Sequence, residues 1–201
     1  TKSSIDVMTP TSWFLSSVPS MFPENKDKTG LTSGFNRSQM AWYTIDPLFN
    51  RKGSTLTPGH IKSDLNQLSN HYVRAIYMRE LFPLRQQQTY STETSTVNAM
   101  NIAFYPNERG PYNFNVADLQ ADGTLANPQK HWGGMMRKLD TNDFEQANVE
   151  YIEFWMLDPF IYSNQQPDAR LYGGDFYINL GEISEDILRD GKKFYESGMP
   201  V

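Results

Sequence analysis

The side chains of this sequence best suited to chemistry are acidic, and they gather in residues 140–145, which read Asp-Thr-Asn-Asp-Phe-Glu. Carboxylate and amide oxygens at such close spacing are the ligands that calcium prefers in proteins. The segment lacks the central glycine and the terminal bidentate glutamate of an EF-hand loop. A structural calcium ion between two β-sheets is one hypothesis, and a turn capped by a polar side chain is the default interpretation.

Two further acids, Glu150 and Glu153, raise the hypothesis of glycoside hydrolysis. That reaction needs two carboxyl groups that converge, roughly 5–10 Å apart. In a regular strand these two residues point to opposite faces, so convergence would need a bulge. We instead expect Glu153 to be a buried carboxylate held by an arginine. The candidate partners of this carboxylate are Arg74, Arg79 and Arg137.

The usual nucleophiles and metal ligands are missing or isolated. The chain has no cysteine, which excludes disulfides, thiolate nucleophiles and cysteine-ligated zinc. His60, His71 and His131 have no partner at the spacing of a helical metal motif, and no Gly-x-Ser-x-Gly sequence is present. We therefore predict no catalytic residue, no cofactor and no metal other than the possible calcium.

Aromatic side chains are the remaining candidates, since the chain has 11 Tyr, 12 Phe and 4 Trp. Trp13 and Phe14 would either anchor a partner or line the core of the same chain, which is the more common role. Trp132 precedes two glycines at a predicted strand entrance, and we expect it to be an exposed platform. Trp13, Phe14 and Trp132 are our possible interaction surface. Trp42 is a further candidate for stacking on sugars, whereas Trp155 is expected in the core.

The element that should organise the chain is the segment 148–159, Asn-Val-Glu-Tyr-Ile-Glu-Phe-Trp-Met-Leu-Asp-Pro. Aromatic and β-branched residues dominate it, and the closing proline offers no amide hydrogen to a ladder. Both of its faces are mostly apolar, which is typical of a strand that is covered on both sides. We predict a core strand here.

Other segments predict further strands, turns and a helix. Residues 61–83 fit either period, and we favour a strand over 71–82 because of its Val, Ile and Tyr content. Residues 184–191 predict a capped helix that begins at Ser184 and ends at Gly191. The other predicted strands cover residues 40–47, 99–106, 132–139 and 176–181.

Short strands separated by turn signals are typical of a mainly β protein. We predict an antiparallel β-sandwich of the jelly-roll type with one or two short helices. Residues 1–35, rich in Ser, Thr, Pro, Asn and Lys, are expected to form an extended, loosely ordered arm. The sandwich domain should span residues 36–201.

The charge and hydropathy of the chain narrow its partners. It has 201 residues with 18 Lys and Arg against 23 Asp and Glu, a net charge of -5. Nucleic acids and anionic lipids favour basic patches, so we expect neither as a partner. No segment approaches the ~20 apolar residues of a transmembrane helix, so no direct membrane span is expected. The chain lacks an initial methionine and a secretion signal, and we expect a fragment or a processed product.

Five phrases occur in an order that resembles one protein family. They are residues 40–49, 107–113, 132–137, 143–145 with 148–160, and 180–186 with 193–196. Together they resemble a segment of the SprA (Sov) family, over about residues 35–201. That family comprises the giant cell-surface proteins of Bacteroidetes that form the outer-membrane translocon of the type IX secretion system and are needed for gliding motility.

The resemblance implies a role in protein export across the outer membrane, within a very large transmembrane β-barrel. Residues 148–159 do not read as a barrel strand, because both faces are apolar and the segment carries two glutamates. We therefore expect a soluble domain in a periplasmic or extracellular portion of an outer-membrane protein. The implied partners are the remainder of its own polypeptide, other translocon subunits and exported cargo proteins.

Two functional hypotheses from different classes follow. The first is a non-enzymatic structural or interaction domain of the translocon. The alternative is a carbohydrate-binding β-sandwich module, because an aromatic surface on such a domain can stack on sugars.

Overall fold

The computed structural model describes residue 5 and residues 7–26, 31–84, 96–141, 143–161, 173–189 and 191. The chain divides into two compact units, the first formed by Thr1–Ala41 with Ile102–Val201 and the second by Trp42–Asn101. The boundary between the units falls within the two longest strands, β2 (Ser38–Tyr43) and β5 (Asn101–Arg109). The expected boundary at residue 35, between an arm and a sandwich domain, stays a prediction.

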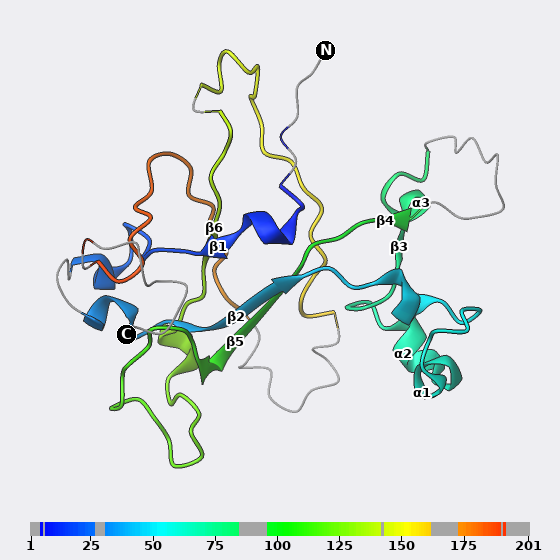
Figure 1. Cartoon of the computed structure of the whole chain (residues 1–201), viewed down its shortest axis with the longest axis horizontal. Helices are drawn as coiled ribbons and strands as arrows, with labels where there is room; N and C mark the ends of the chain where they lie inside the picture. The colour runs from blue at the N-terminus through cyan, green and yellow to red at the C-terminus, as the bar shows by residue number, and fades with distance from the viewer. Residues whose placement is uncertain are drawn as a thin grey trace. The chain divides into compact units, whose positions relative to one another are not determined.

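Short strand pairs are the main regular structure in the described ranges (Figure 1). The pairs are β2 with β5, β1 (Phe14–Leu15) with β6 (Met135–Met136), and β3 (Ile76–Tyr77) with β4 (Thr96–Val97). β1 and β6 are antiparallel, as are β3 and β4. In the β2–β5 pair Ser38 bonds to Pro106 and Tyr43 to Asn101, so these strands also run in opposite directions.

Helices are short and few. The α-helices are α1 (Gly59–Ser63), α2 (Leu65–Ser69) and α3 (Met78–Leu81), all in the second unit. The 3-10 turns are η1 (Pro10–Ser12), η2 (Pro23–Lys26), η3 (Leu31–Gly34), η4 (Pro47–Asn50) and η5 (Pro128–Lys130). No helix among the described residues has the length and apolar character needed to cross a membrane.

These elements agree with the predicted fold class only at a coarse level. Few helices and short antiparallel strand pairs are compatible with a mainly β protein. The predicted strands at 40–47 and 99–106 correspond to β2 and β5, and the one at 132–139 is reduced to β6. The three two-stranded pairs of the described residues do not by themselves make up a β-sandwich or a jelly roll.

Polar side chains fix where the helices of the second unit begin. The carboxylates of Asp46 and Asp64 accept hydrogen bonds from amides in the first turns of η4 and α2. Glu80 accepts one from the amide of Tyr77, 2.9 Å away, at the start of α3. This local capping explains why the strand expected over residues 71–82 is formed only in β3 and gives way to a helix.

The core of the first unit is small and partly polar. Its buried apolar side chains are Val18, Leu125, Trp132 and Ile187. The backbone of β2 approaches the turn after β5 so closely that a Cβ on Gly110 would overlap the carbonyl group of Ser38. Gly133 and Gly134 mark a second close approach, because a Cβ at either position would meet a neighbouring side chain.

Three predicted elements are absent from the described residues. Residues 149–158 and 176–181 lie in no strand, because a strand needs a neighbour to bond with and no described strand pairs with either segment. Residues 184–189 form no helix. The side chain of Asp186 accepts hydrogen bonds from the amides of Arg189 (2.7 Å) and Gly191 (2.8 Å), which closes a turn in place of a helix.

Candidate functional site

Arg37, just before β2, is fully buried, with 0 % of its surface exposed. The central carbon of its guanidinium lies 4.4 Å from the centroid of the Trp132 ring. Its Nη1 donates to the carbonyl of Ser16 at 2.7 Å, and its own carbonyl accepts from Asn113 Nδ2 at 2.8 Å. A charge in the interior is tolerated when such contacts replace water, so Arg37 ties several distant chain segments together.

Pro106, in the middle of β5, has a carbonyl oxygen that accepts two side-chain hydrogen bonds. Ser38 Oγ donates to it at 3.1 Å, and His131 Nδ1 lies 2.8 Å away. Because a carbonyl oxygen only accepts, Nδ1 carries a proton and donates. Proline has no amide hydrogen for the strand ladder, and these side chains hold the strand in its place.

The other ring nitrogen of His131, Nε2, lies 2.7 Å from Oδ2 of Asp118, and the histidine side chain is fully buried. Asn127 Nδ2 donates to the second carboxylate oxygen of Asp118 at 2.6 Å. The hydrogen bond from Asn127 is the largest cause of a lowered pKa for Asp118; that from His131 adds to it, and burial opposes it. Asp118 is therefore a carboxylate at neutral pH.

A serine, a histidine and an aspartate in one cluster raise the question of a hydrolytic triad. Ser38 and His131 both donate to the carbonyl of Pro106 and not to each other. Both residues are also buried, so a substrate has no access to them. We call Arg37, Ser38, Pro106, Asp118, His131 and Trp132 the buried cluster, and its geometry is that of a structural anchor.

Trp132 belongs to this interior, and the expectation that it is an exposed platform was wrong. Only 7 % of its surface is exposed. Its ring packs edge-on against Phe22, with centroids 5.6 Å apart, and stacks on Arg37. Gly133 allows the side chains of Phe104 and Met40 to approach, and Gly134 allows Ser16 to approach, so the chain packs closely around the indole.

Trp13 and Phe14 lie at the strand pair β1–β6 in the first unit. Phe14 is 61 % exposed and sits opposite Met136. Trp13 is half-buried, donates from its ring nitrogen to the carbonyl of Val7 at 2.8 Å, and has the guanidinium of Arg137 5.9 Å from its ring centroid. The structure leaves Phe14 accessible, and it does not bring the three predicted surface residues onto one face because Trp132 is buried.

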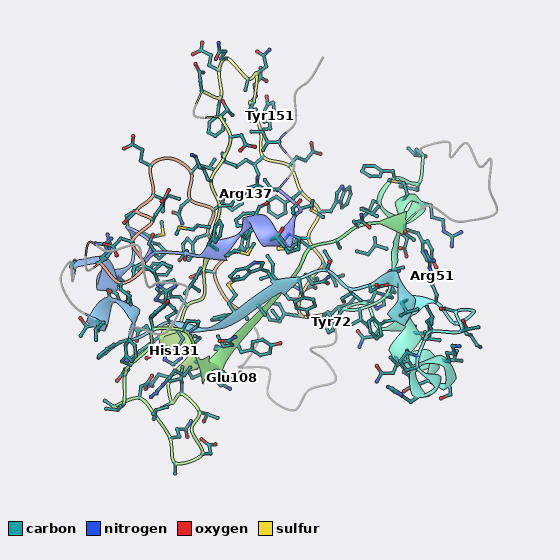
Figure 2. The ribbon with its side chains drawn as sticks, in the orientation of Figure 1. Arg51, Tyr72, Glu108, His131, Arg137 and Tyr151 are labelled. Carbon is teal, nitrogen blue, oxygen red and sulfur yellow. The ribbon has the colours of Figure 1, made fainter. Side chains whose placement is uncertain are left out.

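Many of the exposed large apolar side chains among the described residues lie elsewhere, in residues 149–161 and 173–183, which we call the apolar segments. Figure 2 shows Tyr151 on a long loop without strands. Trp155, expected in the core, is 64 % exposed, and Tyr151 is 82 % exposed. The other large apolar residues of these segments that are more than half exposed are Ile152, Phe154, Met156, Phe176 and Leu180. The sequence reasoning missed this surface because it treated a doubly apolar strand as already covered.

The apolar segments are anchored to the rest of the first unit at a few points. Phe22, which packs on Trp132, also packs edge-on against Tyr177, with ring centroids 5.7 Å apart. The two segments meet at Phe154 and Phe176, whose centroids are 6.1 Å apart. Their aromatic side chains are therefore held beside a fixed interior while much of their surface stays open.

The acidic residues 140–145 form the capped turn of the default interpretation. Thr141 Oγ1 accepts from the amide of Asp143 at 3.2 Å, and Asp143 Oδ1 accepts from the amide of Gln146 at 2.8 Å. Asn142 lies outside the described residues. Across the part of the chain that the structure describes, no three His, Asp or Glu side chains gather as a metal site would require.

Glu153 is exposed, so the expectation of a buried carboxylate held by an arginine was wrong. Arg74 instead pairs with Glu80, with 3.0 Å between nitrogen and oxygen. The hydrogen bonds from Arg74 and from the Tyr77 amide lower the pKa of Glu80. Glu150 is exposed as well, on the same irregular segment.

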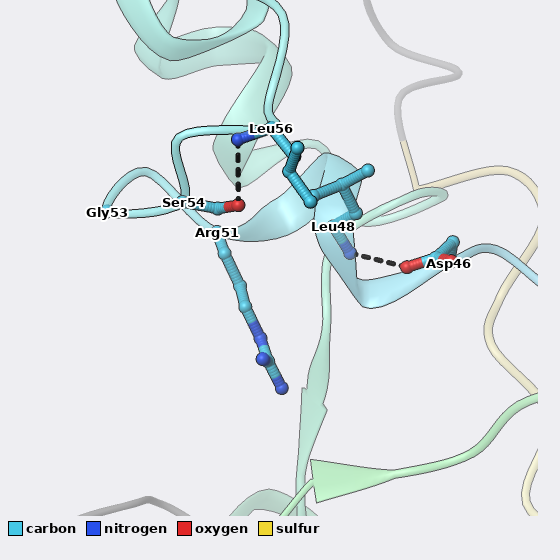
Figure 3. Close-up of a pocket in the computed structure, with 6 residues that line it drawn as sticks. All are labelled: Asp46, Leu48, Arg51, Gly53, Ser54 and Leu56. Carbon is cyan, nitrogen blue, oxygen red and sulfur yellow. Dashed lines mark hydrogen bonds between the residues drawn. The ribbon is translucent and has the colours of Figure 1, made fainter.

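The second unit has a shallow depression of about 560 Å³ beside η4 (Figure 3). Leu48 and Leu56 line it together with Arg51, whose side chain extends away from the loop. The carboxylate of Asp46 is already bonded to the amide of Leu48 at 2.8 Å. The depression thus lacks the converging polar groups of a small-molecule site.

The chain matches no protein-family model and no curated protein sequence.

Proposed function

We propose that this chain is a non-enzymatic interaction domain of an outer-membrane protein-export translocon, in a periplasmic or extracellular portion of that protein. In this proposal its strand pairs belong to an antiparallel β-sandwich of the jelly-roll type. Its partners are the remainder of its own polypeptide, other translocon subunits and exported cargo. The type IX secretion system and gliding motility are the processes that the SprA family resemblance implies.

One observation carries the proposal. One of the phrases that carry the resemblance, residues 148–160, also contains a run of exposed apolar side chains between Tyr151 and Leu157. Exposed apolar surface of this extent is typical of sites that contact other proteins. The buried cluster supports the non-enzymatic part of the proposal, because its polar groups bind other groups of the same chain.

Secretion in cells that carry the full-length polypeptide tests this function. Phe154→Asp with Trp155→Asp should lower the amount of exported cargo in the medium, measured by mass spectrometry. Val116→Asp is a matched control, because Val116 is exposed in the same unit but lies outside the apolar segments. Immunoblots of the outer membrane separate lost export from lost protein. Normal export by the double variant would contradict the proposal.

The alternative function, a carbohydrate-binding module, is favoured by the exposure of Tyr151 and Trp155. Exposed aromatic rings of this kind can stack on the apolar face of a sugar. A glycan array, followed by titration of tryptophan fluorescence with any oligosaccharide that binds, tests it. A Trp155→Ala variant that binds the same oligosaccharide equally well would exclude this role for Trp155.

A further inference from the structure

Parts of the apolar segments lack regular backbone pairing with other described residues and also carry exposed side chains. Residues 150–154 and 173–183 lie in no strand and form no backbone–backbone hydrogen bond with another described residue. Their composition is rich in Tyr, Ile and Phe, which are strong strand formers. A segment with high β-propensity that is not paired with another described strand is a template for the addition of a strand.

In a strand, residues 151–157 would have apolar side chains on both faces, so a partner has to leave both faces able to be covered. In a strand, Tyr151, Trp155 and Leu157 would lie on one face, with Ile152, Phe154 and Met156 on the other. A groove on a partner would cover only one of these faces. A sheet edge satisfies the backbone and places the segment where both faces can be covered.

The negative charge of the apolar segments indicates which kind of partner protein they would bind. Their described residues include no Lys, Arg or His, and their acidic residues are Glu150, Glu153, Asp158, Asp175 and Glu182. A second copy of the chain would place the same acids opposite each other, which is unfavourable. A partner with basic residues beside its sheet edge is complementary in charge.

We propose that residues 149–161 and 173–183 dock a partner protein by strand addition, and that the partner presents a free β-sheet edge flanked by Lys or Arg. This inference rests on the proposed function only in treating the chain as an interaction domain. It adds the binding residues and the chemistry of the partner.

Hydrogen exchange of the 201-residue chain with a pair of synthetic peptides tests the proposal. One peptide alternates Val and Thr and carries two Lys at each end, and the other carries Glu in place of Lys. The Lys peptide should slow amide exchange in residues 150–158 and 173–183 by about tenfold or more. It should also bind about tenfold more tightly than the Glu peptide, with a smaller preference at high salt.

Variants locate the binding and its charge preference. Phe154→Asp should abolish the protection, and Val116→Asp should leave it unchanged. Glu150→Lys with Glu153→Lys should reverse the preference toward the Glu peptide. These substitutions lie at exposed positions, where most changes affect stability little.

Three outcomes would overturn the docking proposal: no protection by either peptide, equal binding of both, or a dimer in sedimentation whose interface protects the same amides. The strand-addition proposal and the translocon proposal can be overturned independently. Lost export by the Phe154→Asp, Trp155→Asp variant without peptide binding overturns strand addition alone. Normal export with peptide binding overturns the translocon function alone.

Discussion

Arg37 and Trp132 stack in the interior of the first unit, with the guanidinium carbon 4.4 Å from the centroid of the indole ring. The backbones of the two residues are also joined, because they form a parallel bridge and the amide of Ser38 donates to the carbonyl of Trp132 at 2.9 Å. Side-chain and backbone contacts therefore join the segment around Arg37 to the segment around Trp132. Loss of the side-chain contact should lower the stability of the fold.

Arg37→Ala should lower the free energy of unfolding by about 2–4 kcal/mol. It removes a charge-assisted hydrogen bond to Ser16 and a cation–π contact that is shielded from water. Urea unfolding followed by circular dichroism measures the change. Arg51→Ala is the matched control, because Arg51 is exposed, and its effect should stay within about 0.5 kcal/mol. Equal effects of the two substitutions would contradict the anchoring role of Arg37.

Gly110→Ala should destabilise the chain by about 1–3 kcal/mol, because the new methyl group would overlap the backbone carbonyl of Ser38. The opposing group is backbone, so the clash cannot be relieved by rotation of a side chain. Gly53→Ala is the control, since a Cβ at Gly53 would have no atom within 4 Å. Thermal unfolding of both variants gives the comparison. A melting temperature for Gly110→Ala that equals the control would show that the close approach is absent.

Asn127→Ala should raise the pKa of Asp118 toward its ordinary value of about 3.9, because it removes the hydrogen bond that lowers this pKa most. Carboxyl carbon shifts in an NMR titration report the change. Asp122 is an internal control, because its pKa is lowered by the amide and hydroxyl of Thr124 and should stay low. Movement of both pKa values together would point to a global loss of structure.

The loss of stability caused by Asn127→Ala should depend on pH. The folded pKa of Asp118 is depressed, so its contribution to stability is complete above the unfolded value of about 3.9 and is lost as the pH falls through the folded value. Asn127→Ala should therefore cost most stability near neutral pH and progressively less below about pH 4. Urea unfolding across this range checks the sign, and a cost that grows on acidification would refute it.

Arg74→Ala should raise the pKa of Glu80, because the hydrogen bond from Arg74 is the largest cause that lowers it. The stability cost should stay below about 1 kcal/mol, since 39 % of the Glu80 side chain is exposed and water screens the pair. Arg79→Ala should shift this pKa less, because Arg79 contributes only a more distant attraction. A larger shift for Arg79→Ala in an NMR titration would reverse this assignment.

The sequence predicts the elements whose signals are local. β2 follows from its aromatic residues and β5 from Ile102 and its aromatic residues, and the capped turn at Asp143 follows from turn-forming side chains. The helix expected at Ser184 fails for an equally local reason, because the Asp186 side chain binds the amides that a helix would use.

The buried cluster could not be predicted, because its contacts join residues that are far apart in the chain. Nothing near Arg37 or His131 in sequence indicates that both lie in the interior. Trp132 shows the same limit, because nothing local indicates that the side chains packed at its two glycines would leave the ring buried. For residues 149–158 the predicted core strand was wrong, because a pattern of strand-forming residues does not specify a neighbour for the strand to bond with.

Phe22 touches Trp132 on one side and Tyr177 on the other, and so links the interior of the first unit to one of its apolar segments. Its protons lie in the ring currents of both neighbours. A displacement of Tyr177 would therefore alter the proton chemical shifts of Phe22 without any change at the indole. The proton chemical shifts of Phe22 can therefore report the binding of a partner at residues 173–183 without an attached label.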